Sequence, residues 1–146
     1  MNYQPKNPDY IPHIQDAFAR QGLMQTFRAE LQGISPGQVV IEQDFAEGLL
    51  QQHGGLHGGV IAALLDTACG LSAVTLLPAG QGILTIEFKT NFLSPGSAER
   101  FRFVGKVLKP GRRVTVSEGR AYAIGKTGDK LIASMTATMM TIDLKG

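Results

Sequence analysis

Cysteine and charged residues are both scarce in this 146-residue chain. Its single cysteine, Cys69, excludes an internal disulfide, and a reducing compartment is expected. Lysine and arginine outnumber aspartate and glutamate by only 14 to 12 and are spread along the chain, which argues against nucleic acid as a partner. The first residues, MNYQPKNPDYIPH, show neither the apolar core nor the cleavage pattern of a secretory signal. We therefore expect a cytoplasmic protein.

Long hydrophobic runs are also missing, except for residues 60–77. Asp66 interrupts this run, and an aspartate within a membrane helix costs roughly 2.5–3.5 kcal/mol, which argues against a membrane span. In a water-soluble protein, a helix that is apolar around most of its circumference is buried on most sides. The chain length and the 43% hydrophobic content predict one domain, residues 1–146, with one core.

The segments around this helix alternate apolar and polar residues, as strands do. Residues 27–34 and 38–45 predict a hairpin, and four more strands are predicted at 84–92, 99–104, 114–124 and 131–142. Pro-Gly pairs at 36–37, 95–96 and 110–111 predict turns in which glycine takes a positive φ. The pattern in 84–92 predicts an apolar face with Leu84, Ile86, Phe88 and Phe92, and a polar face with Thr85, Glu87, Lys89 and Asn91.

Residues 1–27 are predicted to be an N-terminal extension with one short amphipathic helix, since apolar residues lie near helical spacing within 11–27. The complete order is a short helix, two strands, a buried helix and four strands. A helix that is apolar on all sides needs a large cover, which a curved sheet can supply. The fold class predicted is α+β, with an antiparallel sheet of about six strands wrapped around one long central helix.

Asp66 stands out within the buried helix. At 100° per residue it falls in a stripe of small residues, which are Gly59, Ala62, Ala63, Gly70 and Ala73. A carboxylate shielded from bulk water is unfavourable unless it is hydrogen-bonded, or unless its shifted pKa serves a function. Two interpretations stay open: a structural aspartate satisfied by neighbouring hydroxyl or amide groups, and a catalytic one.

Glycines at the start of the helix favour the catalytic interpretation. A helix that begins near Gly58 presents free backbone N–H groups to a developing oxyanion, and glycine lets a carbonyl approach closely. However, Gly58 and Asp66 lie roughly 12 Å apart along one helix, too far to hold the same carbonyl. If they act together, Gly58 of one subunit must meet Asp66 of another at a two-fold interface.

The run Gln51-x-x-Gly54-x-x-His57-Gly58-Gly59, followed by Asp66, resembles the signature of hotdog-fold acyl-CoA thioesterases of the phenylacetate-degradation (PaaI-like) type. The resemblance continues in LTIEFKTNFLSPG, VLKPGRRV and ASMTATMM, and spans about residues 30–142. It implies a hotdog fold and a thioester hydrolase that forms dimers or tetramers. Its substrate would be a small-molecule acyl-CoA or aryl-acetyl-CoA, so that coenzyme A is part of the substrate and no cofactor is expected.

The resemblance also implies residue roles. Asp66 would act as general base or nucleophile, the Gly58 N–H would polarise the thioester carbonyl, and the Thr85 hydroxyl would help to place the attacking water. Gln51, where related proteins often carry asparagine, would offer its amide to the carbonyl or the water. The implied substrate-binding residues are His57, Gly59 and Glu87, and the implied coenzyme A contacts are Lys109, Gly111, Arg112 and Arg113. For these last four, a solvated turn is the alternative.

The histidines and the cysteine allow other interpretations. His53 and His57 have a spacing seen in zinc sites, but Gly-Gly-Leu between them argues against a helix and no third ligand stands at a suitable spacing, so no metal is expected. Cys69 is expected to be a small buried hydrophobe.

Two functions besides hydrolysis stay open: a hydratase or dehydratase acting on acyl thioesters, with His57 joining the carboxylate, and a non-catalytic acyl-CoA-binding module.

Overall fold

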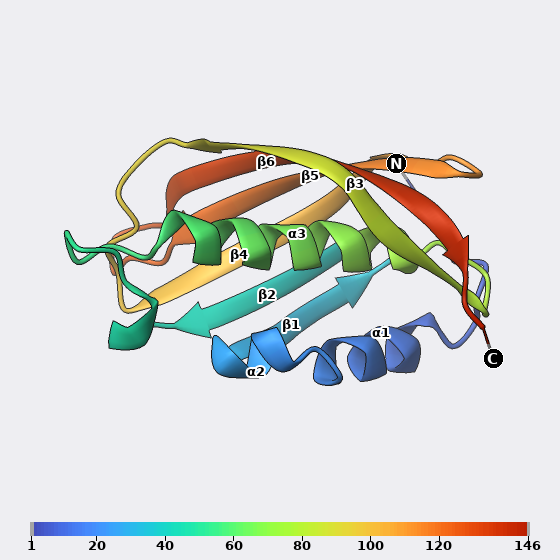
Figure 1. Ribbon diagram of the computed structural model, residues 1–146, viewed down its shortest axis with the longest axis horizontal. Coiled ribbons are helices and arrows are strands. Elements are labelled where there is room, and N and C mark those ends of the chain that lie inside the picture. The colour runs from blue at the N-terminus through green and yellow to red at the C-terminus, as the bar shows by residue number, and fades with distance from the viewer. Residues whose placement is uncertain (1, 146) are drawn as a thin grey trace.

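The structure is a curved six-stranded antiparallel sheet around one long helix, as the sequence predicts (Figure 1). The computed structural model describes residues 2–145. In chain order the elements are α1 (Tyr10–Ala19), α2 (Gly22–Thr26), β1 (Ala29–Ser35), β2 (Gln38–Asp44), the 3-10 helix η1 (Glu47–Leu49), α3 (Gly58–Val74), β3 (Gln81–Phe92), β4 (Arg100–Lys109), β5 (Val114–Ala123) and β6 (Lys130–Asp143). The sheet order is β1-β2-β4-β5-β6-β3, so β1 and β3 are the edge strands. Among residues 2–145, no helix combines the length and the apolar character needed to cross a bilayer.

Two glycines set the distance between α3 and the sheet. Gly105 of β4 and Gly119 of β5 are register partners, and both are buried beneath α3. A Cβ at Gly105 would lie 2.2 Å from the carbonyl of Ala68, and a Cβ at Gly119 would lie 3.0 Å from Sγ of Cys69. Because no side chain fits at Gly105, the helix backbone packs directly on the sheet backbone there. Large buried side chains surround this contact, among them Leu64, Leu65, Phe101, Phe103, Met135 and Met139.

A β-bulge reverses the alternation predicted for residues 84–92. Thr85 pairs with the buried Met139, whereas Glu87 pairs with Thr138 on the outer face, so the register shifts around Ile86. The prediction of one apolar and one polar face was therefore wrong, because an extra residue changes the phase of a period-two pattern. The face of β3 that is turned toward α3 carries Ile83, Thr85, Phe88, Thr90 and Phe92.

The N-terminal region forms two helices where the sequence predicts one. The break falls between α1 and α2, where Gln21 is extended with φ −81° and ψ 101°. Ile14 of α1 and Met24 of α2 are almost fully buried, at 0% and 1% exposure. Both helices are therefore anchored in the main core, and α1 also packs on α3.

The predicted turns are only partly confirmed. The hairpin from β1 to β2 turns at Pro36-Gly37, where Gly37 has φ +80°. Gly96 and Gly111 do not adopt a positive φ, so that part of the prediction was wrong for the other two Pro-Gly pairs. The connection between β5 and β6 contains Gly128 with φ +141°.

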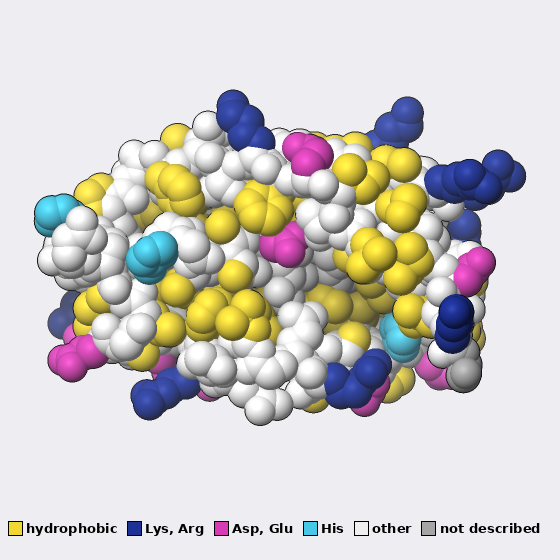
Figure 2. All heavy atoms as spheres, viewed as in Figure 1, with side chains coloured by type: hydrophobic (Ala, Val, Ile, Leu, Met, Phe, Trp, Pro, Cys, Tyr) yellow, Lys and Arg dark blue, Asp and Glu magenta, His cyan; other side chains and the backbone are white. Residues whose placement is uncertain are grey.

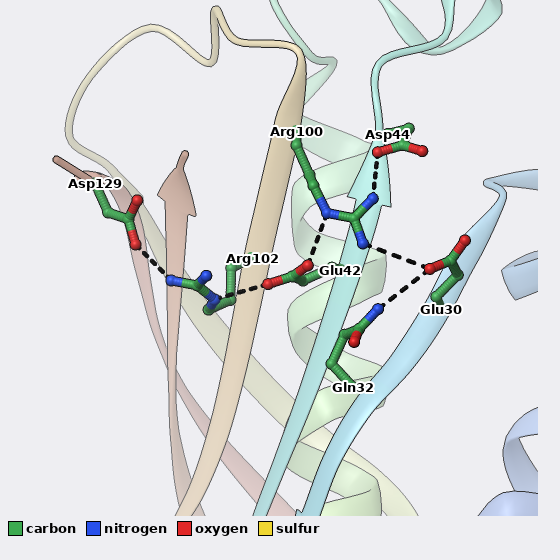
Figure 3. Close-up of polar contacts among 7 residues, drawn as sticks. All are labelled: Glu30, Gln32, Glu42, Asp44, Arg100, Arg102 and Asp129. Atoms are coloured by element: carbon green, nitrogen blue, oxygen red, sulfur yellow. Dashed lines mark hydrogen bonds and ion pairs between the residues drawn. The ribbon is translucent and has the colours of Figure 1, made fainter. Parts of the chain in front are cut away.

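The outer face of the sheet carries an ion-pair network across β1, β2 and β4 (Figure 3). Glu42 accepts hydrogen bonds from Arg100 Nε at 2.7 Å and from Arg102 Nε at 2.9 Å. Arg100 also pairs with Asp44 and Glu30, and Arg102 pairs with Asp129. These charges keep this part of the outer face polar, in contrast to the α3 side, where Figure 2 shows hydrophobic side chains spread across the surface and lysine and arginine mostly at its rim.

Candidate active site

Asp66 lies on the part-exposed face of α3 and is held by a hydroxyl from the sheet. Thr85 Oγ1 donates a hydrogen bond of 2.8 Å to Asp66 Oδ1. The second oxygen, Oδ2, has no hydrogen-bond donor among residues 2–145, so it is available to water or substrate. The predicted small-residue stripe explains part of the access, since Ala62, Ala63 and Asp66 are half-buried and Gly59 is exposed, whereas Gly70 and Ala73 are buried.

A hollow of about 230 Å³ opens beside this carboxylate. Its polar part is formed by Asp66, Thr67 and Thr85, together with Gln21 from the N-terminal region. Its apolar part extends toward the C-terminal end of α3 and is lined by Leu71, Val74 and Ile83. A carboxylate at the border between polar and apolar walls is suited to a substrate in which a polar reacting group is attached to an apolar part.

The N-terminal end of α3 offers one unused backbone donor. His57 is the N-cap: its Nδ1 accepts from the Gly59 N–H at 2.8 Å, and its carbonyl accepts from Val60 and Ile61. Among residues 2–145, the Gly58 N–H has no acceptor. The helix dipole adds partial positive charge there, so the Gly58 N–H can stabilise an oxyanion.

Gln51 shares a second hollow with this donor. The hollow measures about 420 Å³, and its lining includes Gln51, Gly58, Ile61 and Phe92. A tight turn holds Gln51, because its N–H donates to the Gly55 carbonyl at 2.9 Å and its side-chain Oε1 accepts from the His53 N–H. The side-chain amide of Gln51 is thereby positioned beside the start of α3.

The structure groups the four predicted catalytic residues into two pairs. Asp66 and Thr85 line one hollow, Gln51 and Gly58 line the other, and the two hollows have no lining residue in common. Within one chain the two pairs therefore do not act on the same carbonyl. This is the separation that the helical spacing of Gly58 and Asp66 predicts.

The remaining predicted site residues lie elsewhere. Glu87 is on the outer face, where it accepts a 2.6 Å hydrogen bond from Thr138, opposite to the face that carries Thr85. Arg112 and Arg113 are exposed in the β4–β5 hairpin and line a third hollow with Gln81 and Asp143. Lys109 precedes them at the end of β4. Packing requires a glycine at position 111, since a Cβ there would lie 2.1 Å from the Val114 carbonyl oxygen.

Cys69 lies one helical turn from Asp66 but faces the sheet. Burial and the nearby carboxylates of Asp66 and Glu118 raise the pKa of the Cys69 thiol to about 12. At neutral pH the thiol is therefore protonated and is a poor nucleophile. In the part of the chain that the structure describes, no three His, Cys, Asp or Glu side chains gather as metal ligands.

Two residues that border the hollows were missed by the sequence analysis. Gln21 reaches the hollow of Asp66 from a segment interpreted as an extension, and nothing in the sequence near Gln21 indicates this contact. Phe92 lies against the start of α3, since a Cβ at Gly58 would be 3.1 Å from Phe92 Cζ. The bulge in β3 turns Phe92 to the α3 side together with Thr85, and the regular alternation of apolar and polar residues does not indicate that bulge.

Comparisons with known proteins place this geometry in a family. The family model described as the thioesterase superfamily matches residues 53–128. A solved thioesterase family protein from Silicibacter pomeroyi is 42% identical, with a TM-score of 0.90, and the match covers 92% of this chain and 98% of that one. The medium/long-chain acyl-CoA thioesterase YigI of Escherichia coli is 35% identical over 98 residues, which are 58% of this chain and 61% of that protein.

The fold is also that of the PaaI protein from the phenylacetic acid degradation operon of Escherichia coli. The TM-score is 0.82, with 93% of this chain and 96% of that chain covered, at 16% sequence identity. This likeness confirms the hotdog fold that the sequence resemblance implied. The family match, which extends over more than half of the chain, identifies the protein as a thioester hydrolase that belongs to the thioesterase superfamily.

Proposed function

We propose that this thioesterase hydrolyses acyl or aryl-acetyl thioesters of coenzyme A to the free acid and coenzyme A. One observation carries the proposal: the Asp66 carboxylate, anchored by Thr85 through one oxygen and free at the other, lines a hollow with an apolar extension. A carboxylate near neutral pH is an effective base or nucleophile toward an activated acyl group.

The reaction needs a base and an oxyanion donor at the same carbonyl. Asp66 takes a proton from water as the water oxygen attacks the thioester carbon, or attacks that carbon itself to form a mixed anhydride that water then opens. Either route places negative charge on the carbonyl oxygen, and the Gly58 N–H, with Gln51 beside it, stabilises that charge. In the base route, the tetrahedral intermediate breaks the carbon–sulfur bond and Asp66 returns its proton to the departing thiolate of coenzyme A. In the nucleophile route, the carbon–sulfur bond breaks as the anhydride forms, and the thiolate takes a proton from water.

We propose that the two halves of the site meet across a dimer interface, with Asp66 and Thr85 from one subunit and Gly58 and Gln51 from the other. The separate hollows support this arrangement. Strand β3 supports it as well, because it is an edge strand whose Leu84, Ile86, Phe88 and Phe92 are 43–57% exposed. A long apolar edge strand in a free monomer invites pairing with another chain, and a two-fold interface produces two equivalent sites.

The proposal extends to the substrate carrier and the location of the enzyme. Arg112 and Arg113 are exposed, take part in no ion pair among residues 2–145 and border a hollow, so they can contact the phosphates of coenzyme A, as can Lys109 nearby. Acyl-CoA metabolism and the lone reduced cysteine are both consistent with a cytoplasmic enzyme.

The alternative of a hydratase finds less support in the geometry. That chemistry needs a histidine paired with the carboxylate across the interface, but His57 Nδ1 is already used as the acceptor that caps α3. Experiment distinguishes a non-catalytic acyl-CoA-binding module from a hydrolase, because the binding module would leave the bound thioester intact.

The test is a panel of acyl-CoA substrates, from short to long and including phenylacetyl-CoA, assayed by release of free thiol. The wild type should hydrolyse at least one member, and Asp66→Asn should lower that rate a hundredfold or more. Asparagine keeps the acceptor for Thr85, so the variant should fold, and its thermal transition provides the control. Near-normal hydrolysis by Asp66→Asn would remove the carboxylate from its role.

A further inference from the structure

The N-terminal helices contribute a polar side chain to the hollow of Asp66. Gln21, at the break between α1 and α2, lines this hollow although it lies 45 positions before Asp66. It also lies outside the residues that the family model matches. Ile14 and Met24, on either side of it in the chain, are buried in the core, so the backbone that carries Gln21 is fixed.

One hydrogen bond orients the Gln21 amide. Thr67 Oγ1 donates to Gln21 Oε1 at 3.2 Å, and this contact joins Gln21 to the residue that follows Asp66. One of the two acceptor positions of the Gln21 side-chain oxygen is thereby used. Its Nε2 group, which is a donor only, has no acceptor among residues 2–145.

The other polar side chains of the hollow are already engaged. The Thr67 hydroxyl donates to Gln21 and the Thr85 hydroxyl donates to Asp66. Among the described residues that line this hollow, the Nε2 group of Gln21 is therefore the side-chain donor that remains for a ligand. Beyond it, the hollow is apolar, with Leu71, Val74 and Ile83 as its walls.

We propose that Gln21 determines acyl-group selectivity and favours acyl groups that carry a hydrogen-bond acceptor, such as a hydroxyl or oxo group. This inference rests on the proposed hydrolysis of acyl thioesters. A purely aliphatic acyl group that fills the hollow displaces the water bound to the Nε2 amide and offers no hydrogen-bond acceptor in its place. A hydroxylated or oxo-substituted acyl group supplies that acceptor. Gln21 acts on the choice of substrate and not on the chemical step, which belongs to Asp66.

The experiment compares matched pairs of substrates, such as 3-hydroxybutyryl-CoA with butyryl-CoA and 4-hydroxyphenylacetyl-CoA with phenylacetyl-CoA. The wild type should prefer the hydroxylated member of at least one pair. Gln21→Leu, which keeps the size and removes the amide, should lower that ratio of kcat/KM about tenfold, the effect of one neutral hydrogen bond. Thr67→Val, which frees the amide to rotate, should lower the ratio in the same direction.

Gln25→Leu is the matched control. Gln25 lies in the same segment, is exposed and donates to the Ala19 carbonyl at 3.0 Å, so its loss should leave the ratio unchanged. If the wild type is active and Gln21→Leu does not alter its kcat/KM ratio, the role of Gln21 is overturned. The same holds if Gln21→Leu lowers kcat/KM equally for both members of a pair while the thermal transition is unchanged. Both outcomes leave the proposed hydrolysis intact. A wild type that hydrolyses no thioester would contradict both.

Discussion

The hydroxyl of Thr85 and the carboxylate of Asp66 are joined by a 2.8 Å hydrogen bond between a sheet edge and the central helix. The bond orients the side chain of Asp66, and Oδ2, which has no donor among residues 2–145, is the atom proposed to react. It also connects the candidate active site to β3, the strand proposed to lie at the dimer interface. In the proposed dimer, Thr85 would link subunit association to the position of the carboxylate.

Replacement of Thr85 by valine should lower kcat about tenfold, because Asp66 loses the donor that orients it. Thr85→Ser should retain most of the activity. Thr90→Val is the control on the same face of β3, since the buried Thr90 hydroxyl has no hydrogen-bond partner within residues 2–145 and should be dispensable. Steady-state kinetics of the three variants checks this prediction, and equal losses in Thr85→Val and Thr90→Val would contradict it.

Gly58→Pro should remove the oxyanion donor without breaking α3. Proline is favoured at the first position of a helix, and His57 already has the extended conformation required before proline, with φ −59° and ψ 135°. We expect kcat to fall about 10²–10³-fold, as for the loss of one oxyanion donor. Gly58→Ala adds a carbon near Phe92 but keeps the N–H, so it should be far less impaired. Similar losses in both variants would point to steric blockage instead.

Mixing inactive subunits tests the shared site. An Asp66→Asn chain and a Gly58→Pro chain, unfolded together and refolded at equal amounts, should form mixed dimers in which one of the two sites is intact. About a quarter of the wild-type activity should return, since half of the dimers are mixed and each has one good site. Activity is measured by thiol release, with each variant refolded alone as the control. No recovery, although mixed dimers are detected, would assign both groups to one subunit.

Gly105→Ala should destabilise the fold by about 3 kcal/mol or more, because the new carbon would overlap the Ala68 carbonyl and push α3 off the sheet. Gly48→Ala is the control, since a carbon added at Gly48 meets open space. Urea denaturation followed by circular dichroism compares the two free energies of unfolding. A Gly105→Ala variant as stable as Gly48→Ala would show that the helix does not rest on this glycine.

The Cys69 thiol should make stability depend on pH in the alkaline range. Its pKa is about 12 in the folded protein, against 9.0 for an ordinary thiol, so the folded state keeps a proton that the unfolded state releases above pH 9. The stability advantage of the wild type over Cys69→Ala should be constant below about pH 8 and should shrink by about 1 kcal/mol at pH 10. Urea denaturation of both proteins at several pH values measures this difference. A constant difference up to pH 10 would contradict burial of the thiol.

The sequence by itself determined the central helix, the antiparallel strands and the placement of Asp66. Their signals are local: an unbroken apolar run, period-two alternation, and small residues at helical spacing around one carboxylate. The distance between Gly58 and Asp66 also follows from the sequence alone, because it depends only on the rise of a helix.

Only the tertiary structure decided which side chains surround that carboxylate. The bulge near Ile86 turns Thr85 and Phe92 toward α3 and sends Glu87 outward, and no alternation pattern reveals an extra residue in a strand. The approach of Gln21 to Thr67 joins segments 46 positions apart. This contact arises from the packing of α1 and α2 on the core. That packing depends on interactions among residues far apart in the sequence, so the residues next to Gln21 do not indicate it.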